Sequence, residues 1–134
     1  MALTAQLEFG NNATGIYSSK YNVADFRCHF VRSDNEARPD GTARCDYFDL
    51  TLPVPDKSDL SLQEWFINRS FLCGRVHVEL SATAKEGAVQ YRDFLFENAV
   101  CFSIEEEYHI DKDALRSMRL LIAPESLKIA GVSF

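Results

Sequence analysis

Hydrophobic and polar residues alternate along most of the chain, and this period of two predicts β-strands. Turn-forming residues such as Gly, Asn, Pro and Ser separate the alternating segments. Together they predict an all-β fold with one short helix, either a β-barrel or a two-sheet sandwich of about seven to nine strands. The segments in which we expect strands are residues 3–9, 16–31, 48–54, 76–80, 94–104, 118–122 and 127–131. Lys85-Glu86-Gly87 is expected to form a hairpin turn into a strand that starts near Val89.

A single helix is expected over about residues 58–69. The sequence Ser61-Leu62-Gln63-Glu64 fits a capping box, in which Ser61 and Glu64 each satisfy a free backbone N–H at the helix start. Three turns are too few to be stable alone, so we expect Trp65 and Phe66 to pack on a sheet. If one of these aromatic side chains were exposed, it would be an interface anchor instead.

The longest apolar stretch, residues 94–104, places hydrophobic side chains at every even position except Asn98. At about 3.3 Å per residue it spans roughly 36 Å, which is longer than most single strands. Asn98 is therefore predicted to mark a bulge or corner at which one strand leaves a sheet and enters another.

The odd positions of the same stretch are also partly apolar, because they include Leu95, Ala99 and Cys101. A strand that buries one face and exposes the other would carry polar residues there. We therefore expect part of the outward surface to be covered by another protein, which points to an assembly rather than to a pocket.

The run Glu105-Glu106-Glu107 follows this stretch. Neighbouring strand residues point to opposite faces, so at most two of the three carboxylates share one face. Without a histidine, a cysteine or a third acid at a suitable spacing, a metal site is not indicated. We predict a solvated strand end.

Composition limits the classes of partner. The chain has 134 residues, so a single domain over 1–134 is expected. Its formal net charge of −6 disfavours a nucleic-acid partner. The N-terminus lacks the features of a signal peptide, and no segment has 18 uninterrupted apolar residues, so we expect no membrane partner and synthesis in the cytoplasm.

The candidate chemical groups form no catalytic or metal-binding motif. Cys28, Cys45, Cys73 and Cys101 are separated by 17, 28 and 28 positions, which favours four reduced structural thiols over zinc ligands. His29, His77 and His109 are each isolated. No catalytic residue, cofactor or metal is therefore predicted. Two alternatives stay open: a lipocalin-like barrel that binds a small molecule among its ten phenylalanines, and a hydrolase whose triad assembles in space.

The polar segment Ser33–Thr42, with the sequence SDNEARPDGT, is longer than a typical hairpin loop. With Val31-Arg32 before it, this segment resembles the R-x-D-x-x-G-R-P loop of the Hcp (TssD) tube proteins of type VI secretion systems, particularly a branch found in Bacteroidetes. Residues 94–99, FLFENA, resemble the strand and corner of that branch, and residues 123–131, APESLKIAG, resemble its C-terminal end. The resemblance covers nearly the whole chain.

This resemblance implies a phage tail-tube-like fold: a β-barrel or sandwich that forms hexameric rings, which stack into a tube. The implied partners are other copies of the chain, a VgrG-like spike protein, a contractile sheath and effector proteins. The implied location is the cytoplasm, followed by secretion through the type VI apparatus without a signal peptide. The segment 33–42 would then contact the neighbouring ring, with Arg32, Asp34, Glu36, Arg38 and Asp40 as candidate ring-stacking residues.

Overall fold

The computed structural model describes residues 4–32, 43–80, 90–111, 115–129 and 132–133, and the predicted turn at residues 85–87 lies outside them. Strands dominate this part of the chain and one short helix joins them, as the alternation predicts. The described elements are β1 (Thr4–Asn11), β2 (Ile16–Val23), β3 (Asp25–Arg32), β4 (Ala43–Pro53), α1 (Ser61–Asn68), β5 (Leu72–Leu80), β6 (Gln90–His109), β7 (Leu115–Ala123), β8 (Ser126–Ile129) and β9 (Val132–Ser133).

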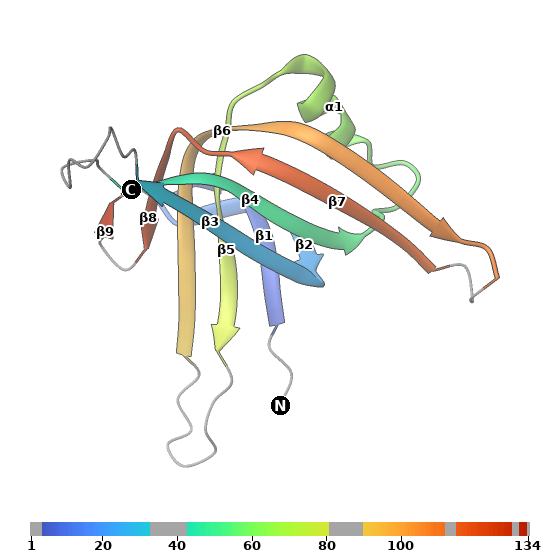
Figure 1. Ribbon diagram of the computed structural model, residues 1–134, viewed down its shortest axis with the longest axis horizontal. Coiled ribbons are helices and arrows are strands. Elements are labelled where there is room, and N and C mark those ends of the chain that lie inside the picture. The colour runs from blue at the N-terminus through green and yellow to red at the C-terminus, as the bar shows by residue number, and fades with distance from the viewer. Residues whose placement is uncertain (1–3, 33–42, 81–89, 112–114, 130–131, 134) are drawn as a thin grey trace, which may run out of the picture.

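The strands form two antiparallel sheets that share β6. Sheet A contains β2, β1, β5, the first half of β6, β8 and β9. Sheet B contains the second half of β6, then β7, β4 and β3. In Figure 1 the strands of sheet A run down the view, whereas those of sheet B run across it. The described strands do not close into a barrel, so the sandwich is the correct form of the predicted fold.

The predicted strand over residues 16–31 is two strands in the structure, which corrects the sequence-based boundary. The division falls at Ala24, whose backbone N–H donates to the carbonyl oxygen of Thr51 at 2.7 Å. The strand before this residue pairs with β1 in sheet A, and the strand after it pairs with β4 in sheet B. The half-buried positions of β2 are odd up to Val23 and those of β3 start even at Phe26, so the alternation shifts by one residue at this junction.

The predicted corner at Asn98 is confirmed. Before this residue β6 pairs with β5 and β8, and from Val100 onward it pairs with β7. Asn98 has a φ of 49°, in the left-handed region that asparagine tolerates better than most residues. Its side-chain amide donates to Glu125 Oε2 at 2.9 Å, which ties the corner to the β7–β8 turn.

The corner changes which side chains of β6 face the core. Phe96 is buried before the corner, but Ala99 and Cys101 are buried after it. A second register shift, between Cys101 and Ser103, leaves Phe102 half exposed. The prediction that even positions keep one face throughout is therefore wrong for Val100 and Phe102, because the left-handed residue reverses the alternation. After the second shift, Ile104 packs against the core again.

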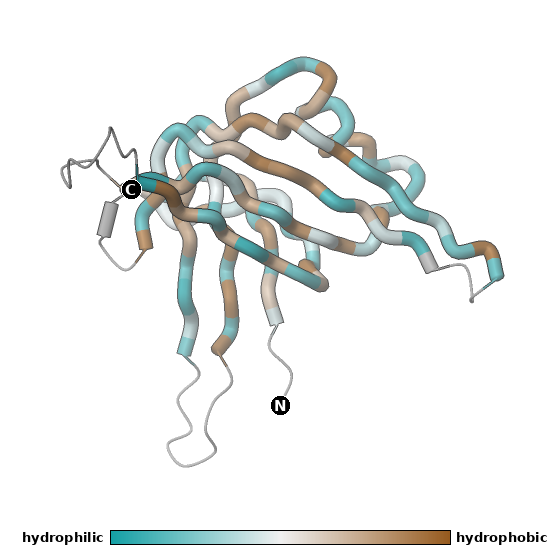
Figure 2. The backbone as a smooth tube through the Cα atoms, in the orientation of Figure 1, coloured by the Kyte–Doolittle hydropathy of each residue, from teal (hydrophilic) through white to brown (hydrophobic). Residues whose placement is uncertain are grey.

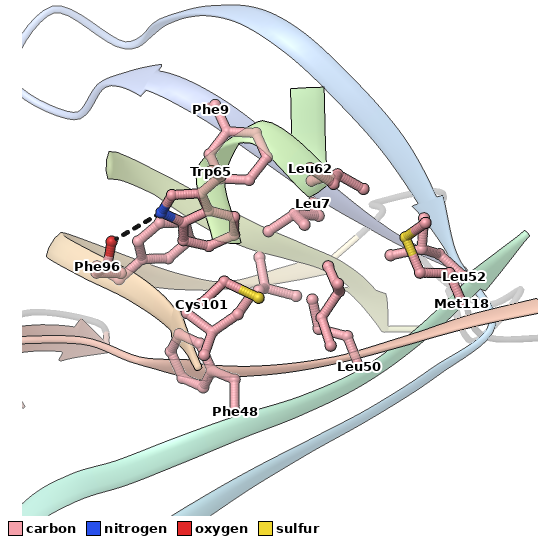
Figure 3. Packing of buried hydrophobic residues seen from close by; sticks show 14 of the residues in the cluster. Leu7, Phe9, Phe48, Leu50, Leu52, Leu62, Trp65, Phe96, Cys101 and Met118 are labelled. Carbon is pink, nitrogen blue, oxygen red and sulfur yellow. Dashed lines mark hydrogen bonds between the residues drawn. The ribbon is translucent and has the colours of Figure 1, made fainter. Parts of the chain in front are cut away.

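The core fills the space between the two sheets. Phe48 and Leu50 of sheet B pack against side chains of sheet A and α1, including Leu7, Phe9 and Trp65 (Figure 3). Edge-to-face aromatic pairs join the layers, with ring centroids 5.2 Å apart for Phe9 and Trp65. The described residues thus pack a solid interior, unlike the hollow interior that a lipocalin-like barrel needs.

Helix α1 is shorter than predicted and is capped differently. Its N-cap position is Leu60, and no side chain caps it there. Instead, the backbone N–H of Ser61 donates to Asp59 Oδ1 at 3.0 Å, so the predicted capping box is wrong. The hydrogen bonds from Ser61 hold the pKa of the Asp59 carboxyl below its ordinary value. At the other end, Arg69 ends the helix in the left-handed conformation, with a φ of 54°.

The second half of β6 and its partner β7 extend away from the body of the sandwich (Figure 1). Glu105, Glu106 and Glu107 lie in this hairpin and are all exposed, which confirms that they are solvated. The strand nevertheless continues to His109, so they do not mark its end. Figure 2 shows that this part of the hairpin is mostly hydrophilic.

Candidate functional site

Apolar side chains gather on the outer surface of α1 and the second half of β6. Ile67 is 72% exposed, Phe71 67% and Phe102 49%, and Phe66 is also exposed. With Val100 they line a hollow of about 560 Å³. We call these five residues the α1–β6 surface. Large exposed apolar side chains that adjoin one another are typical of protein–protein contacts.

The helix contributes to this surface because its apolar residues occupy two faces. Trp65 points into the core, where it is 2% exposed and its Nε1 donates to the carbonyl oxygens of Ser70 and Ala99. Phe66 and Ile67 follow it directly and therefore lie on the outer side. The expected packing is confirmed for Trp65, whereas Phe66 is the exposed aromatic that the alternative interpretation describes.

The corner in β6 supplies the rest of the surface. Because Ala99 and Cys101 turn inward after Asn98, Val100 and Phe102 turn outward beside the helix. Odd and even spacing predicts Ala99 and Cys101 on the outer face, and that placement is wrong. An apolar outer surface does exist, but other residues form it.

The outer side of sheet A is polar and is organised around a buried carboxylate. Glu8 lies between the core residues Leu7 and Phe9, so its side chain points away from the core, yet it is only 1% exposed. Arg75 Nη2 lies 3.1 Å from Glu8 Oε1, and Lys20 Nζ lies 4.0 Å from the same oxygen. The buried charge is thus neutralised within one subunit.

Arg75 also binds two neighbours on β6 and β2. Its Nη1 lies 3.3 Å from Asp93 Oδ2, and its guanidinium lies 4.4 Å from the centre of the Tyr17 ring. Burial lowers the pKa of Arg75, but the hydrogen bond to Glu8 and the charges of Asp93 and Glu8 outweigh that effect and raise it. For Tyr17, burial raises the pKa. Arg75 therefore stays charged and holds the network together.

The three histidines make contacts typical of structural residues. His29 stacks on Tyr47, and His109 Nε2 lies 2.8 Å from Glu107 Oε1. His77 pairs with Asp93 and stacks on Tyr91. The side-chain partners of His77 and His109 are thus carboxylates, Asp93 and Glu107 respectively. Within the described residues, no three His, Cys, Asp or Glu side chains group as metal ligands would.

The four cysteines are free thiols, and two of them are neighbours. The Sγ atoms of Cys28 and Cys45 lie 3.5 Å apart. Their mutual hydrogen bond, together with burial, raises the pKa of Cys28. Burial raises the pKa of Cys101 to about 11. Neutral thiols at these positions fit the predicted structural role.

The candidate ring-stacking residues are only partly placed. Arg32 is exposed at the end of β3, where it pairs with Ala43 of β4. Asp34, Glu36, Arg38 and Asp40 lie outside the described residues. The structure therefore places Arg32, the residue that precedes the segment 33–42, at the edge of sheet B.

The residues FENA have a specific structural basis. Phe96 is in the core, and Asn12 Nδ2 donates to both the carbonyl oxygen of Phe96 and Glu97 Oε1, at 3.0 and 3.1 Å. Asn98 forms the left-handed corner, and Ala99 is completely buried. Each position of this segment is thus determined by the corner.

The whole chain matches one protein family. The model of the hemolysin coregulated protein Hcp (TssD) covers residues 1–134. The chain belongs to the Hcp (TssD) family. Hcp proteins are tube proteins of the type VI secretion system, so this is a type VI secretion tube protein, and its family is structural rather than enzymatic. The resemblance found in the sequence is confirmed.

Solved Hcp structures share the fold at low sequence identity. Hcp1 from Flavobacterium johnsoniae is 14% identical, with 100% of this chain and 98% of that chain covered and a TM-score of 0.66. Hcp1 from Salmonella typhimurium is 11% identical, with 100% and 92% covered and a TM-score of 0.69. A further Hcp crystal structure is 16% identical, with 99% and 96% covered and a TM-score of 0.72. No curated protein matches the sequence.

Secretion is a property of the family, and the described part of the chain adds one observation on membranes. It contains no helix that is both long and apolar enough to cross a bilayer.

Proposed function

We propose that this Hcp-family chain forms hexameric rings through the α1–β6 surface, and that the rings stack into a tube exported with effector proteins. The observation that supports ring formation is the group of adjoining apolar side chains that one subunit leaves in solvent. Within the same subunit, the polar groups on the outer side of sheet A already have partners. The adjoining apolar residues of the α1–β6 surface therefore gain more from a second copy than these paired polar groups do.

The gain is large enough to favour association. Full burial of a Phe or Ile side chain contributes about 1.5–3 kcal/mol. In the monomer, about half or more of the side chain is still exposed at Ile67, Phe71 and Phe102. In a head-to-tail ring the surface meets a different patch on the next subunit, and closure repeats the contact around the ring.

The test of this proposal is the mass of the assembly. Light scattering after gel filtration is expected to give a hexamer for the natural chain and a folded monomer for Ile67→Asp, because burying a carboxylate there is costly. Ile16→Asp is the matched control, since Ile16 is 70% exposed but lies on β2. A natural chain that stays monomeric, or an Ile67→Asp variant that still forms hexamers, would contradict the proposal.

Stacking is proposed to use the segment 33–42, with Arg32 at its base. The segment combines acidic and basic residues, and charged contacts at ring surfaces are individually weak, about 0–1 kcal/mol when exposed. Weak contacts allow a tube to form and later come apart. Replacing residues 33–42 by a short Gly-Ser turn is expected to keep hexamers but to abolish tubes in electron micrographs. Loss of soluble protein would show instead that the segment is needed for folding.

The proposed partners beyond the chain itself are a VgrG-like spike, the contractile sheath and effectors, as in the family. Co-purification of the hexamer with these components is the corresponding measurement. The Ile67→Asp monomer serves as the control, because a partner that recognises the ring should not bind it.

A further inference from the structure

Two of the four cysteines lie side by side on neighbouring strands. Cys28 is on β3 and Cys45 on β4, 17 positions apart in sequence, and their Sγ atoms are 3.5 Å apart. A disulfide bond has a length of about 2.05 Å, so the two sulfurs would have to approach by roughly 1.5 Å. Cys28 lies opposite Phe48 and Cys45 opposite Phe30, so the two cysteines are diagonal neighbours. Closing the bond therefore takes a small backbone movement at the bulge as well as rotation about the Cα–Cβ bonds.

A β-bulge places the two thiols on the same side of sheet B. The register runs from His29 opposite Tyr47 to Phe30 opposite Cys45, which leaves Asp46 without a partner. This extra residue turns Cys45 inward, to the side of Phe48. In a regular ladder Cys45 would point to the opposite side, because a shift by one residue reverses the facing of a strand.

The pair is accessible to small solutes. Cys28 is partly exposed, although it packs against the core. Cys45 lines a surface hollow of about 200 Å³ together with Arg44, Asp46 and Glu125. Cys45 itself is 7% exposed, and the polar lining of the hollow lets water and small polar oxidants approach it.

We propose that Cys28 and Cys45 are an oxidation site that forms an intrasubunit disulfide, with a hydroperoxide as the oxidant. The Cys45 sulfur attacks the peroxide, so that the O–O bond breaks, an S–O bond forms and water leaves. The Cys28 sulfur then attacks Cys45: the S–S bond forms, the S–O bond breaks and a second water leaves with the remaining thiol proton. Two thiols are oxidised and one hydrogen peroxide is reduced to two waters.

The link would join β3, the last strand on the sheet B side, to its neighbour β4. It would also enclose the segment 33–42 in a closed loop. The cytoplasm keeps thiols reduced, whereas extracellular spaces allow disulfides, so export, which rests on the proposed function, would provide the change in conditions. The disulfide chemistry itself does not depend on assembly.

The test is a thiol map of the purified full-length chain before and after hydrogen peroxide. Peptide mass spectrometry with blocking of free thiols is expected to find a Cys28–Cys45 crosslink and free thiols at Cys73 and Cys101. Reducing agent should reverse it. The oxidised chain is expected to melt at a temperature roughly 10 °C higher, because a loop of this length loses unfolded-state entropy.

Three variants make the result specific. Cys73→Ser should still form the crosslink, whereas Cys28→Ser and Cys45→Ala should not. If both thiols of the natural chain stay free, or if each oxidises separately to a sulfinic acid, the proposal is wrong. The same map on the Ile67→Asp variant separates the two proposals, because the crosslink is expected there even if the rings are lost or never form.

Discussion

The two halves of β6 belong to one strand, but their outward side chains differ in polarity. Before Asn98 the outward residues include Asp93, which lies in the ion-pair network with Arg75. After Asn98 they include Val100 and Phe102, which lie in the α1–β6 surface. In the first half, Asp93 is paired within one subunit, whereas the second half leaves apolar side chains exposed. The difference indicates that the change of facing at Asn98 divides β6 into two parts. One part pairs its polar side chains within the subunit, and the other presents apolar side chains suited to a subunit contact.

The largest stability effect is expected beside the first half of β6, at Arg75→Ala in β5. This change leaves Glu8 buried without its main partner, and breaking a buried ion pair from one side costs about 3 kcal/mol, the low end of the usual range because Arg75 is partly exposed. Urea unfolding measures the loss. Lys20→Ala is the control and should have little effect, because the Lys20 side chain is 57% exposed. Equal losses for both variants would show that Arg75 is not the residue that stabilises Glu8.

A smaller effect is expected at the junction itself, with Asn98→Val. A β-branched residue in the left-handed conformation costs about 1–2 kcal/mol. Asn98→Gly loses the same hydrogen bond to Glu125 but accepts the backbone angle without strain. The two variants therefore separate backbone strain from the lost hydrogen bond in urea unfolding. If Asn98→Val is no less stable than Asn98→Gly, the corner does not depend on the left-handed residue.

The smallest effect is expected for the exposed ion pair on sheet B, between Arg119 and Asp49. The hydrogen bond from Arg119 holds the pKa of the Asp49 carboxyl below its ordinary value. The stabilisation is therefore present above the unfolded-state pKa of about 3.9 and is lost as the pH falls through the lower pKa of the folded state. Acid unfolding should show the natural chain losing its small advantage over Asp49→Asn across this range. An advantage that persists below it would contradict the assignment.

Much of the fold is predictable from the sequence, because alternation and turn residues are local signals. The helix position and the corner at Asn98 both follow from such signals. The corner was predictable because a polar residue interrupts an apolar run. The division at Ala24 was missed, although the apolar positions shift there from odd (Tyr21, Val23) to even (Phe26, Cys28). The capping box failed because Asp59, two residues before Ser61, takes the backbone N–H instead.

The apolar surface was predicted to exist but was assigned to the wrong residues. Counting odd and even positions assumes a regular strand, and two register shifts in β6 reverse that count near Asn98 and Phe102. The contribution of Phe71 has no periodic signal, because it lies between α1 and β5. The network around Glu8 also escaped prediction: Glu8 and Arg75 are 67 positions apart and meet only through the pairing of β1 with β5.

The most direct measurement of the central claim is hydroxyl-radical footprinting of the assembled ring against the Ile67→Asp monomer. The method reports the solvent exposure of individual aromatic side chains. Burial of the α1–β6 surface predicts that Phe71 and Phe102 react several-fold more slowly in the ring than in the monomer. If both side chains react at the same rate in the two states, the rings form through another surface and the account is wrong.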